Sequence, residues 1–368
     1  MAKARKKNWL IPVILFFIIY VFVAARPVPG ETVLLPRWLT SLDSGFTINI
    51  ADNSGDAVTH AGTVIPFRLG NRYGYIDDSG RFLINRIQRE SNLSLSSYGW
   101  SEYGATPSTL DIFDQAEQPV MTIKNPGGYP FFLDNRVFII GNEQNSIKCL
   151  DSRGEEQWAY DFPAPLTCVD AASGYVLAGM LDGAIEVLNS SGRQIYSFEP
   201  GGSRLAVILG CAISADGAKL AIVSGIDNQR FLVLEQSGDT YRVVYHEFIS
   251  DGFRRAVHVN FIDNDKKIAY EREGGIGIYD FTSRTGLFMP MEGEIMAMDP
   301  ADNKYLFLVT SGNGRKRLIG ILIPDSRMPP EIVIDAPFRS ANAFLGRQNS
   351  RLFVGGDQGI ISFDLGKK

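Results

Sequence analysis

The sequence has few of the residues that build metal and disulfide sites. Three cysteines and three histidines occur in 368 residues, and their spacing does not match a metal site. The odd number of cysteines argues against a disulfide framework. A small buried side chain is therefore the expected state of Cys149, Cys168 and Cys211.

Sequence motifs of enzymes are also missing. The chain has no Gly-x-Ser-x-Gly motif, phosphate loop or dinucleotide fingerprint. The glycine-rich stretches 273–277 and 354–356 lead into predicted strands instead of a helix N-terminus, so they are interpreted as turns. His60, His246 and His258 are 186 and 12 residues apart along the chain, and His258 alternates with Val257 and Val259 and is expected to pack in the core. The sequence predicts no catalytic, cofactor or metal residue.

The body of the chain lacks an excess of basic residues. Residues 1–26 carry five of the 36 lysines and arginines and no acid, so residues 27–368 hold 31 basic against 41 acidic side chains. A protein that follows nucleic-acid phosphates needs a basic surface. Nucleic acid is therefore not expected as a partner.

Only the N-terminus has a long uncharged apolar run. Residues 9–25 carry no charge and follow four basic residues, Lys3, Arg5, Lys6 and Lys7. This predicts a single-pass transmembrane signal anchor in the cytoplasmic membrane, with a cleaved signal peptide as the alternative. The positive-inside rule places residues 1–8 in the cytoplasm and the rest outside it. Residues 26–44 contain three prolines and show no sustained period, which predicts a tether.

The body is organised around a repeated hairpin. Residues 146–160 and 184–198 both show an apolar strand, a turn in which Asp or Asn precedes Gly by three positions, and a second strand ending in aromatics. No segment of the body sustains a helical period, which favours four-stranded propeller blades. Eight matching strand ends recur every 37 to 46 residues, at Asp77, Asp114, Asp151, Asn189, Glu235, Asp280, Pro324 and Asp364.

We therefore predict an all-β, eight-bladed β-propeller over residues 45–368. The last repeat stops just after its third strand, and residues 46–50 form an isolated strand ahead of the first complete repeat. Strand 46–50 is expected to complete the last blade, which closes the ring. A seven-bladed ring is the alternative, because residues 92–103 predict a weak second blade. Cys168 and Cys211 fall on inner strands of neighbouring blades, so a disulfide between them is the alternative to two free thiols.

The repeats resemble those of known propellers. Residues 149–158, Cys-Leu-Asp-Ser-Arg-Gly-Glu-Glu-Gln-Trp, resemble the hairpin of PQQ-like propellers. Residues 214–222, Ser-Ala-Asp-Gly-Ala-Lys-Leu-Ala-Ile, look like the inner turn of WD-repeat propellers. In plan, an eight-bladed propeller exposed in the envelope is similar to the propeller lipoprotein of the outer-membrane β-barrel assembly machinery. Adjacent cysteines, as in PQQ-dependent dehydrogenases, are not present, so no quinone cofactor is expected.

Two groups of side chains are candidates for partner binding. Acidic turns between second and third strands are predicted on one face of the ring, at Glu143, Asp182, Asp227, Glu273 and Asp357. They could attract a basic peptide or a cation, although acidic residues also favour turns by themselves, and residues 315–317 make the matching turn of blade 7 basic. In the irregular second blade, Tyr98, Trp100 and Tyr103 are predicted to form an exposed interface hot spot, with packing between blades as the alternative.

Two functions follow from these observations. The favoured function is a membrane-anchored extracytoplasmic propeller that serves as a protein–protein interaction scaffold for other envelope proteins. The alternative is a propeller enzyme or ligand sensor with its site in the central channel, toward which His258 could point. Such a site is assembled from separate inner strands and leaves no local motif.

Overall fold

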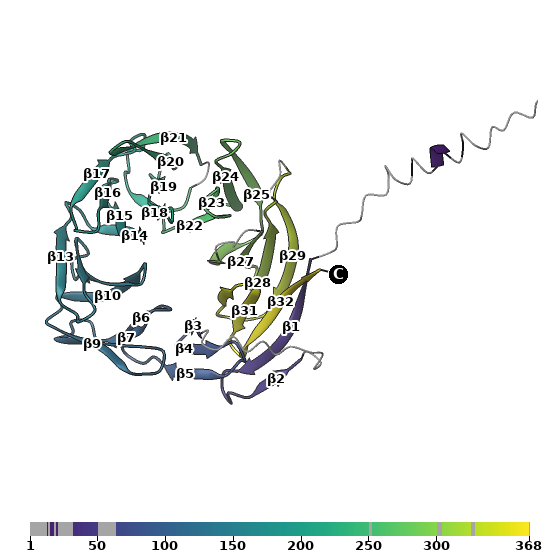
Figure 1. The fold of residues 1–368 in the computed structure, drawn as a ribbon, viewed down its shortest axis with the longest axis horizontal. Coiled ribbons are helices and arrows are strands. Elements are labelled where there is room, and N and C mark those ends of the chain that lie inside the picture. The colour runs from purple at the N-terminus through teal and green to yellow at the C-terminus, as the bar shows by residue number, and fades with distance from the viewer. Residues whose placement is uncertain are drawn as a thin grey trace, which may run out of the picture.

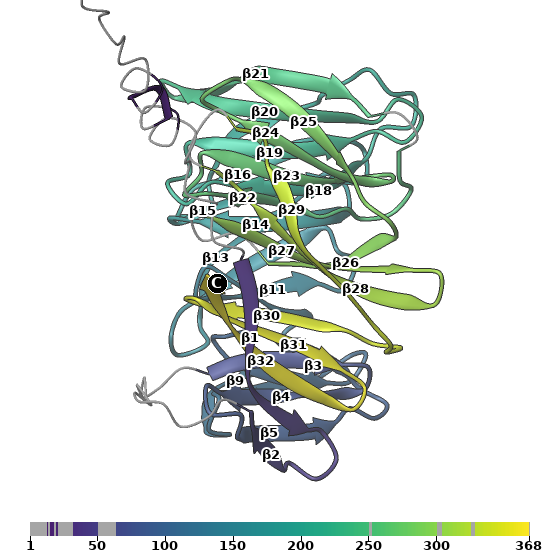
Figure 2. The ribbon, with the colours of Figure 1, turned by 90° about the vertical axis from the view of Figure 1, so that its right-hand side faces the viewer.

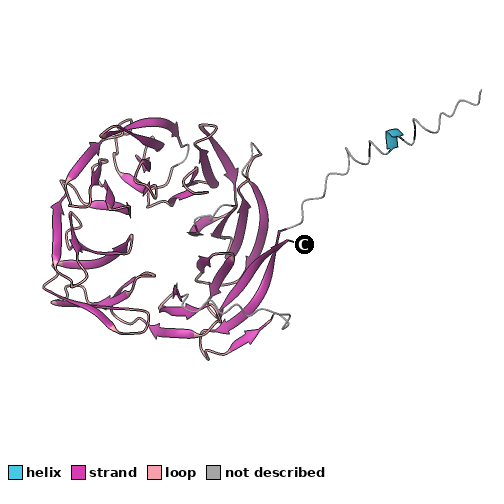
Figure 3. Cartoon of the chain, in the orientation of Figure 1, coloured by secondary structure: helices cyan, strands magenta, loops and turns pink. Residues whose placement is uncertain are grey.

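The chain forms a closed ring of eight antiparallel sheets, as Figure 1 shows. In this computed structural model, residues 13, 15–17, 20, 32–50, 64–249, 252–299, 304–324 and 328–367 are described. Strands account for the regular structure of the ring, and the helical residues lie in the N-terminal segment (Figure 3). The predicted all-β, eight-bladed propeller is confirmed.

Each blade is a meander of strands that runs outward from the axis. Blades 1 to 4 contain β3 (Val64–Leu69), β4 (Arg72–Asp77) and β5 (Phe82–Ile87); β6 (Asn92–Leu95), β7 (Trp100–Tyr103), β8 (Thr109–Phe113) and β9 (Pro119–Lys124); β10 (Gly128–Leu133), β11 (Arg136–Gly141), β12 (Ser146–Leu150) and β13 (Glu156–Asp161); and β14 (Leu166–Ala172), β15 (Tyr175–Met180), β16 (Ile185–Leu188) and β17 (Gln194–Phe198).

Blades 5 to 8 continue the same order. They contain β18 (Ile208–Ile213), β19 (Lys219–Ser224), β20 (Arg230–Ser237) and β21 (Thr240–Phe248); β22 (Val259–Ile262), β23 (Lys267–Arg272), β24 (Gly275–Asp280) and β25 (Thr285–Pro290); β26 (Glu294–Asp299), β27 (Tyr305–Gly312), β28 (Arg315–Leu322) and β29 (Glu331–Phe338); and β30 (Phe344–Gln348), β31 (Arg351–Gly356), β32 (Gly359–Lys367), β1 (Thr32–Ser41) and β2 (Thr47–Asn49).

The hydrophobic core lies between the blades. Second strands such as β11 are buried at four consecutive residues, from Val137 to Ile140, because a neighbouring blade covers each face of the sheet. Outer strands such as β25 are mostly exposed. Core clusters therefore join successive blades; one unites Phe138 of blade 3 with Val176 of blade 4. This packing holds the blades in a rigid ring.

The ring is closed by β1, the outer neighbour of β32. Their antiparallel register runs from Thr32 opposite Lys367 to Ser41 opposite Gly359 (Figure 2). An N-terminal strand closes the last blade as expected, but the predicted closing strand, residues 46–50, is wrong, because β1 lies between β2 and β32 in the sheet. Residues 32–41 of the predicted tether are thus part of the sheet. Pro36 precedes a register shift in β1, a position where a strand tolerates proline.

Blade 1 differs from the others. The turn after β4 carries Asp77 and Gly80, the same spacing as Asp151 and Gly154 after β12, the third strand of blade 3. That correspondence identifies β3, β4 and β5 as the second, third and fourth strands of the blade. Its innermost position has no strand in the described part of the chain.

The predicted anchor, residues 9–25, lies largely outside the described residues, as do residues 1–8. Val13, Leu15, Phe16, Phe17 and Tyr20 are described; they are helical and their side chains are exposed. Among the described residues, no helix is both long enough and apolar enough to span a bilayer.

Candidate functional site

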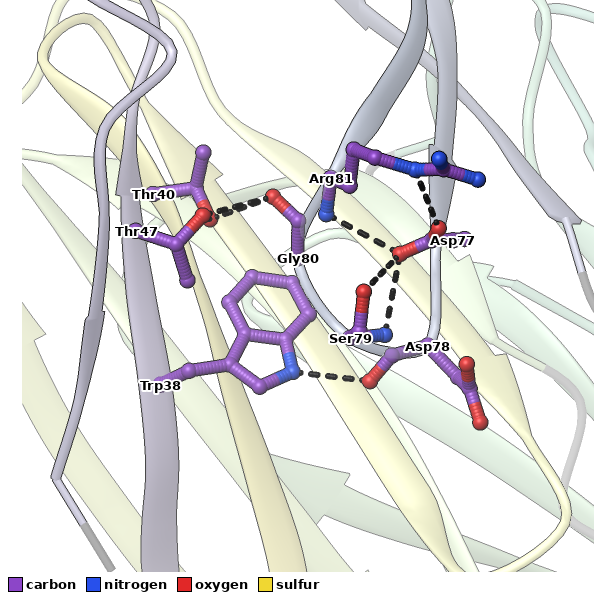
Figure 4. A network of polar contacts seen from close by, with 8 residues as sticks. All are labelled: Trp38, Thr40, Thr47, Asp77, Asp78, Ser79, Gly80 and Arg81. Carbon is purple, nitrogen blue, oxygen red and sulfur yellow. Dashed lines mark hydrogen bonds and ion pairs between the residues drawn. The ribbon is translucent and has the colours of Figure 1, made fainter. Parts of the chain in front are cut away.

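The repeated turn of blade 1 is fastened to the neighbouring blade, as Figure 4 shows. The Asp77 carboxylate accepts hydrogen bonds from the Ser79 and Arg81 backbone N–H groups at 3.0 and 2.9 Å. Although burial opposes the effect, these bonds lower the pKa of Asp77. The Trp38 indole of blade 8 lies against Gly80 and donates to the Asp78 carbonyl oxygen at 2.9 Å. The turn of blade 1 is thereby fixed to blade 8.

The same contact recurs between blades 3 and 4. The Trp158 ring packs under Gly192, the glycine of the next turn, where an added Cβ would lie 2.6 Å from the ring. The Asp151 carboxylate accepts from the Arg153 and Glu155 backbone N–H groups at 2.8 and 2.9 Å. The hairpin that most resembles PQQ-like repeats therefore has a structural role.

The aromatic residues of blade 2 also pack between blades. Trp100 is 3% exposed, so its predicted position on the surface is wrong. Its ring stacks on Phe113, with the ring centroids 4.9 Å apart, and packs on Tyr73 of blade 1, with the ring centroids 5.6 Å apart. Tyr98 and Tyr103 are half-buried against the core cluster between blades 2 and 3. The alternative of packing between blades is therefore the correct one for Trp100, and its partner Tyr73 lies in another blade.

A small cavity opens between blades 1 and 2. It has a volume of about 280 Å³ and is lined by Arg86, Trp100, Glu102, Phe113 and Glu117. Arg86 Nε and Nη2 contact the two carboxylate oxygens of Glu117 at 3.1 and 2.9 Å. Burial opposes ionisation of Glu102, but hydrogen bonds from Ser91 and Tyr73 outweigh it and lower the pKa of Glu102. The charged groups of the cavity thus already have partners within the protein.

The predicted acidic turns lie together at one end of the ring. All five carboxylate side chains are exposed, and each belongs to the turn between the second and third strands of its blade. Because the blades share one antiparallel order, these turns emerge on the same face. Blades 3, 4, 5 and 6 contribute consecutive members, Glu143, Asp182, Asp227 and Glu273, and blade 8 contributes Asp357. We refer to this set as the acidic face.

Two members of the acidic face also hold linkers in place. Asp227 accepts from the Ser203 hydroxyl and from the Arg204 backbone N–H at 3.1 Å, and these bonds lower its pKa to about 2. Asp357 accepts from the Ala341 backbone N–H at 2.6 Å, and its pKa is lowered as well. Each linker enters the blade that carries the carboxylate. These two residues have the turn-forming role that the sequence analysis kept as the alternative.

The remaining acidic side chains are better placed to meet a partner. Asp182 accepts one local bond, from the Ala184 backbone N–H at 3.1 Å, while Glu143 and Glu273 extend from exposed turns. In blade 7, Arg315 is exposed and Arg317 pairs with Asp335 at 2.6 Å. The predicted acidic turn residues are therefore concentrated on blades 3 to 6.

The described cysteines and histidines are spread over several blades of the ring. The three cysteines are free thiols. A hydrogen bond with Cys168, together with burial, raises the pKa of Cys211. Burial lowers the pKa of His258, whose backbone N–H donates to buried Glu271 at 3.2 Å. Among the described residues there is no group of His, Cys, Asp and Glu side chains suited to a metal ion; His60 lies outside them.

Comparisons with known proteins agree with this architecture. The β-propeller protein family matches residues 1–367. An uncharacterized protein of Treponema pallidum (strain Nichols) is 27% identical over 288 residues, which cover 77% of this chain and 75% of that protein. BamB from Moraxella catarrhalis superposes with a TM-score of 0.55 at 13% identity, over 82% of this chain and 96% of BamB. The designed protein Ika8 superposes with a TM-score of 0.58 at 14% identity, over 91% of this chain and 99% of its own. The structural likenesses concern the fold, and the family match extends over nearly the whole sequence: the chain belongs to the β-propeller protein family.

Proposed function

We propose that this chain is a membrane-anchored extracytoplasmic β-propeller that serves as a protein–protein interaction scaffold in the cell envelope. The observation that carries the proposal is the acidic face, where carboxylates from consecutive blades are exposed at fixed spacing on a rigid ring. Such a surface attracts a basic protein segment and speeds its encounter with the ring. The likeness of fold to BamB supports a role of the scaffold in envelope assembly.

The anchoring part of the proposal depends on residues 9–25. Their uncharged apolar sequence and the preceding basic residues support a retained membrane segment with the propeller outside the cytoplasm. The intact mass of the protein purified from membranes tests this. The full mass, with the N-terminal residues included, is expected. A mature N-terminus at Arg26 would show that the segment is a cleaved signal peptide.

The scaffold part is tested by affinity purification from solubilised membranes. The variant Glu143→Gln, Glu273→Gln removes two charges from the acidic face and spares Asp227 and Asp357, which hold linkers. The matched control, Glu155→Gln, Asp239→Asn, removes two exposed charges from turns at the opposite end of the ring. We expect a protein partner to co-purify with the wild type and the control and to be depleted about tenfold with the first variant.

The same purification also addresses the alternative function. Recovery of a bound small molecule or metal ion, without a stoichiometric protein partner, would contradict the scaffold proposal. It would favour an enzyme or ligand sensor with its site in the central channel. Equal recovery of the partner by both variants would instead show that binding does not use the acidic face.

A further inference from the structure

Four exposed apolar side chains form a stripe on the outside of blade 8. They are Leu39 of β1, Ile48 of β2, and Phe46 and Ile50, which flank β2; their exposed fractions are 38, 51, 66 and 45%. Side chains alternate between the two faces of an extended chain, and the backbone bonds of Phe46 and Ile50 to β1 continue the pairing of β2, so Phe46, Ile48 and Ile50 share one face. Leu39 lies directly opposite Ile48 and belongs to the same face. We call these four residues the apolar stripe.

Hydrogen bonds fix the orientation of the apolar stripe. The Ser41 N–H donates to the Phe46 carbonyl oxygen at 3.0 Å, and the Ile50 N–H donates to the Arg37 carbonyl oxygen at 2.8 Å. Thr47 points to the opposite face, where its hydroxyl donates to the Gly80 carbonyl oxygen at 3.0 Å (Figure 4). The stripe therefore faces away from the contact between blades 8 and 1.

The segment 46–50, with β2 at its centre, is additional to the propeller pattern. With β30, β31, β32 and β1, blade 8 already has four strands, and β2 is a fifth strand outside them. Figure 1 shows β2 at the outer rim. An exposed edge with contiguous apolar side chains favours aggregation unless something covers it. The added hairpin thus indicates a surface that is occupied in the cell.

The position of the stripe along the chain identifies its occupant. The apolar run ends at Ala25, and seven residues later β1 begins at Thr32, so the connection spans at most about 25 Å. Leu39 lies seven residues further along β1, about 23 Å from Thr32. A bilayer that holds residues 9–25 is therefore within about 25 Å of Thr32, and the apolar stripe reaches its surface when β1 lies along the membrane. A second copy of the chain fits less well, because β2 offers an edge of three residues.

We propose that the apolar stripe lies in the interfacial region of the bilayer and holds the propeller with its blade 8 rim against the membrane. Aromatic and aliphatic side chains on one face are typical of surfaces that enter this region. The inference rests on the proposed anchoring by residues 9–25 and adds a second, non-covalent contact. It orients the ring axis roughly parallel to the membrane plane, so that the acidic face is open to partners from the side.

Photo-crosslinking of the full chain in phosphatidylethanolamine and phosphatidylglycerol vesicles tests the proposal. One sample carries p-benzoylphenylalanine in place of Ile48, and the control carries it in place of Val243, which is 40% exposed on the outer strand of blade 5. We expect about tenfold more lipid adduct at position 48 than at position 243. Equal lipid adducts, or cross-linked pairs of chains at position 48, would overturn the proposal.

Flotation of the same vesicles separates this proposal from the anchoring that supports it. Chains that float without a lipid adduct at position 48 would be anchored but not docked, which contradicts the further inference alone. Chains that do not float would contradict the proposed anchoring as well. In a second experiment the probe replaces Leu39, with and without the substitutions Phe46→Ser, Ile48→Ser and Ile50→Ser. The substituted chain is expected to lose most of its lipid adduct while it still floats and melts cooperatively. An undiminished adduct would overturn the proposal.

Discussion

Asp299 shows how a single residue of the inner ring responds to pH. Burial on β26 raises its pKa to about 6, although Arg347 of blade 8, 3.9 Å away, opposes the shift. The folded state therefore binds this proton more tightly than the unfolded chain, whose aspartate has a pKa of 3.8. This contribution to stability is fully present below about pH 4 and is lost as the pH rises through about 6.

The variant Asp299→Asn tests this assignment because it keeps the side chain neutral at every pH. At pH 8 we expect its free energy of unfolding to exceed that of the wild type by about 1 to 2 kcal/mol, with little difference at pH 4. Urea unfolding at the two pH values provides the measurement. A variant that is less stable than the wild type at pH 8 would mean that attraction to Arg347 outweighs the cost of burying the charge.

At the scale of the element, the repeated turn depends on a glycine that lies under a tryptophan. Gly192 has φ of 74°, and an added Cβ would lie 2.6 Å from the Trp158 ring. We expect Gly192→Ala to lower the free energy of unfolding by about 2 to 4 kcal/mol, from backbone strain and the displaced ring together. Chemical denaturation with tryptophan fluorescence follows both effects.

The matched control for this substitution is Gly201→Ala. Gly201 has a similar φ of 62°, but its added Cβ would meet no atom within 4 Å in the described part of the chain. Only the backbone cost of about 1 kcal/mol is expected there. Equal losses of stability in the two variants would show that the contact between Trp158 and Gly192 does not help to join blades 3 and 4.

The local elements could be predicted from the sequence because their signals are local. A turn such as residues 151–154 contains its own acid, donors and glycine, so the hairpins and the blade number were recognisable. The closing strand was missed because Pro36 and a register shift interrupt the strand pattern of β1, so that its sequence was interpreted as a tether. Its partner β32 lies at the other end of the chain. Trp38, which repeats the contact of Trp158, was missed with it.

For the candidate site, too, the sequence predicted the local turns but not the contacts between distant residues. Repeat alignment found the turns of the acidic face, since each turn follows from its own flanking strands. It did not reveal that Asp227 and Asp357 bind linkers, because the bonded N–H groups lie 15 to 23 residues away along the chain. The burial of Trp100 likewise depends on Tyr73 from another blade. Contacts between blades are the part that a repeat pattern does not contain.

At the scale of the whole molecule, closure by β1 predicts where the chain can be shortened. A chain that begins at Thr32 retains the ladder with β32, and its melting temperature is expected to lie within a few degrees of the full chain. A chain that begins at Gly45 loses that ladder together with the buried side chains of Trp38 and Leu42. Removal of one buried tryptophan already costs about 3 to 5 kcal/mol, so this shorter chain should not fold cooperatively.

Calorimetry of the two shortened chains measures the difference. If the chain from Gly45 melted like the full protein, residues 46–50 would have to pair with β32 in place of β1. That outcome would contradict the closure described for blade 8. It would also displace the apolar stripe from the outer rim.

The central claim, that the ring binds a protein partner through its acidic face, is tested most directly by zero-length cross-linking. Carbodiimide treatment of intact membranes joins carboxylates to the amines of a bound partner, and mass spectrometry identifies the linked residues. The account predicts links from Glu143, Asp182 or Glu273 to lysines of one other envelope protein. Links that arise only from turns at the opposite end of the ring, such as those of Glu155 and Asp239, would contradict it.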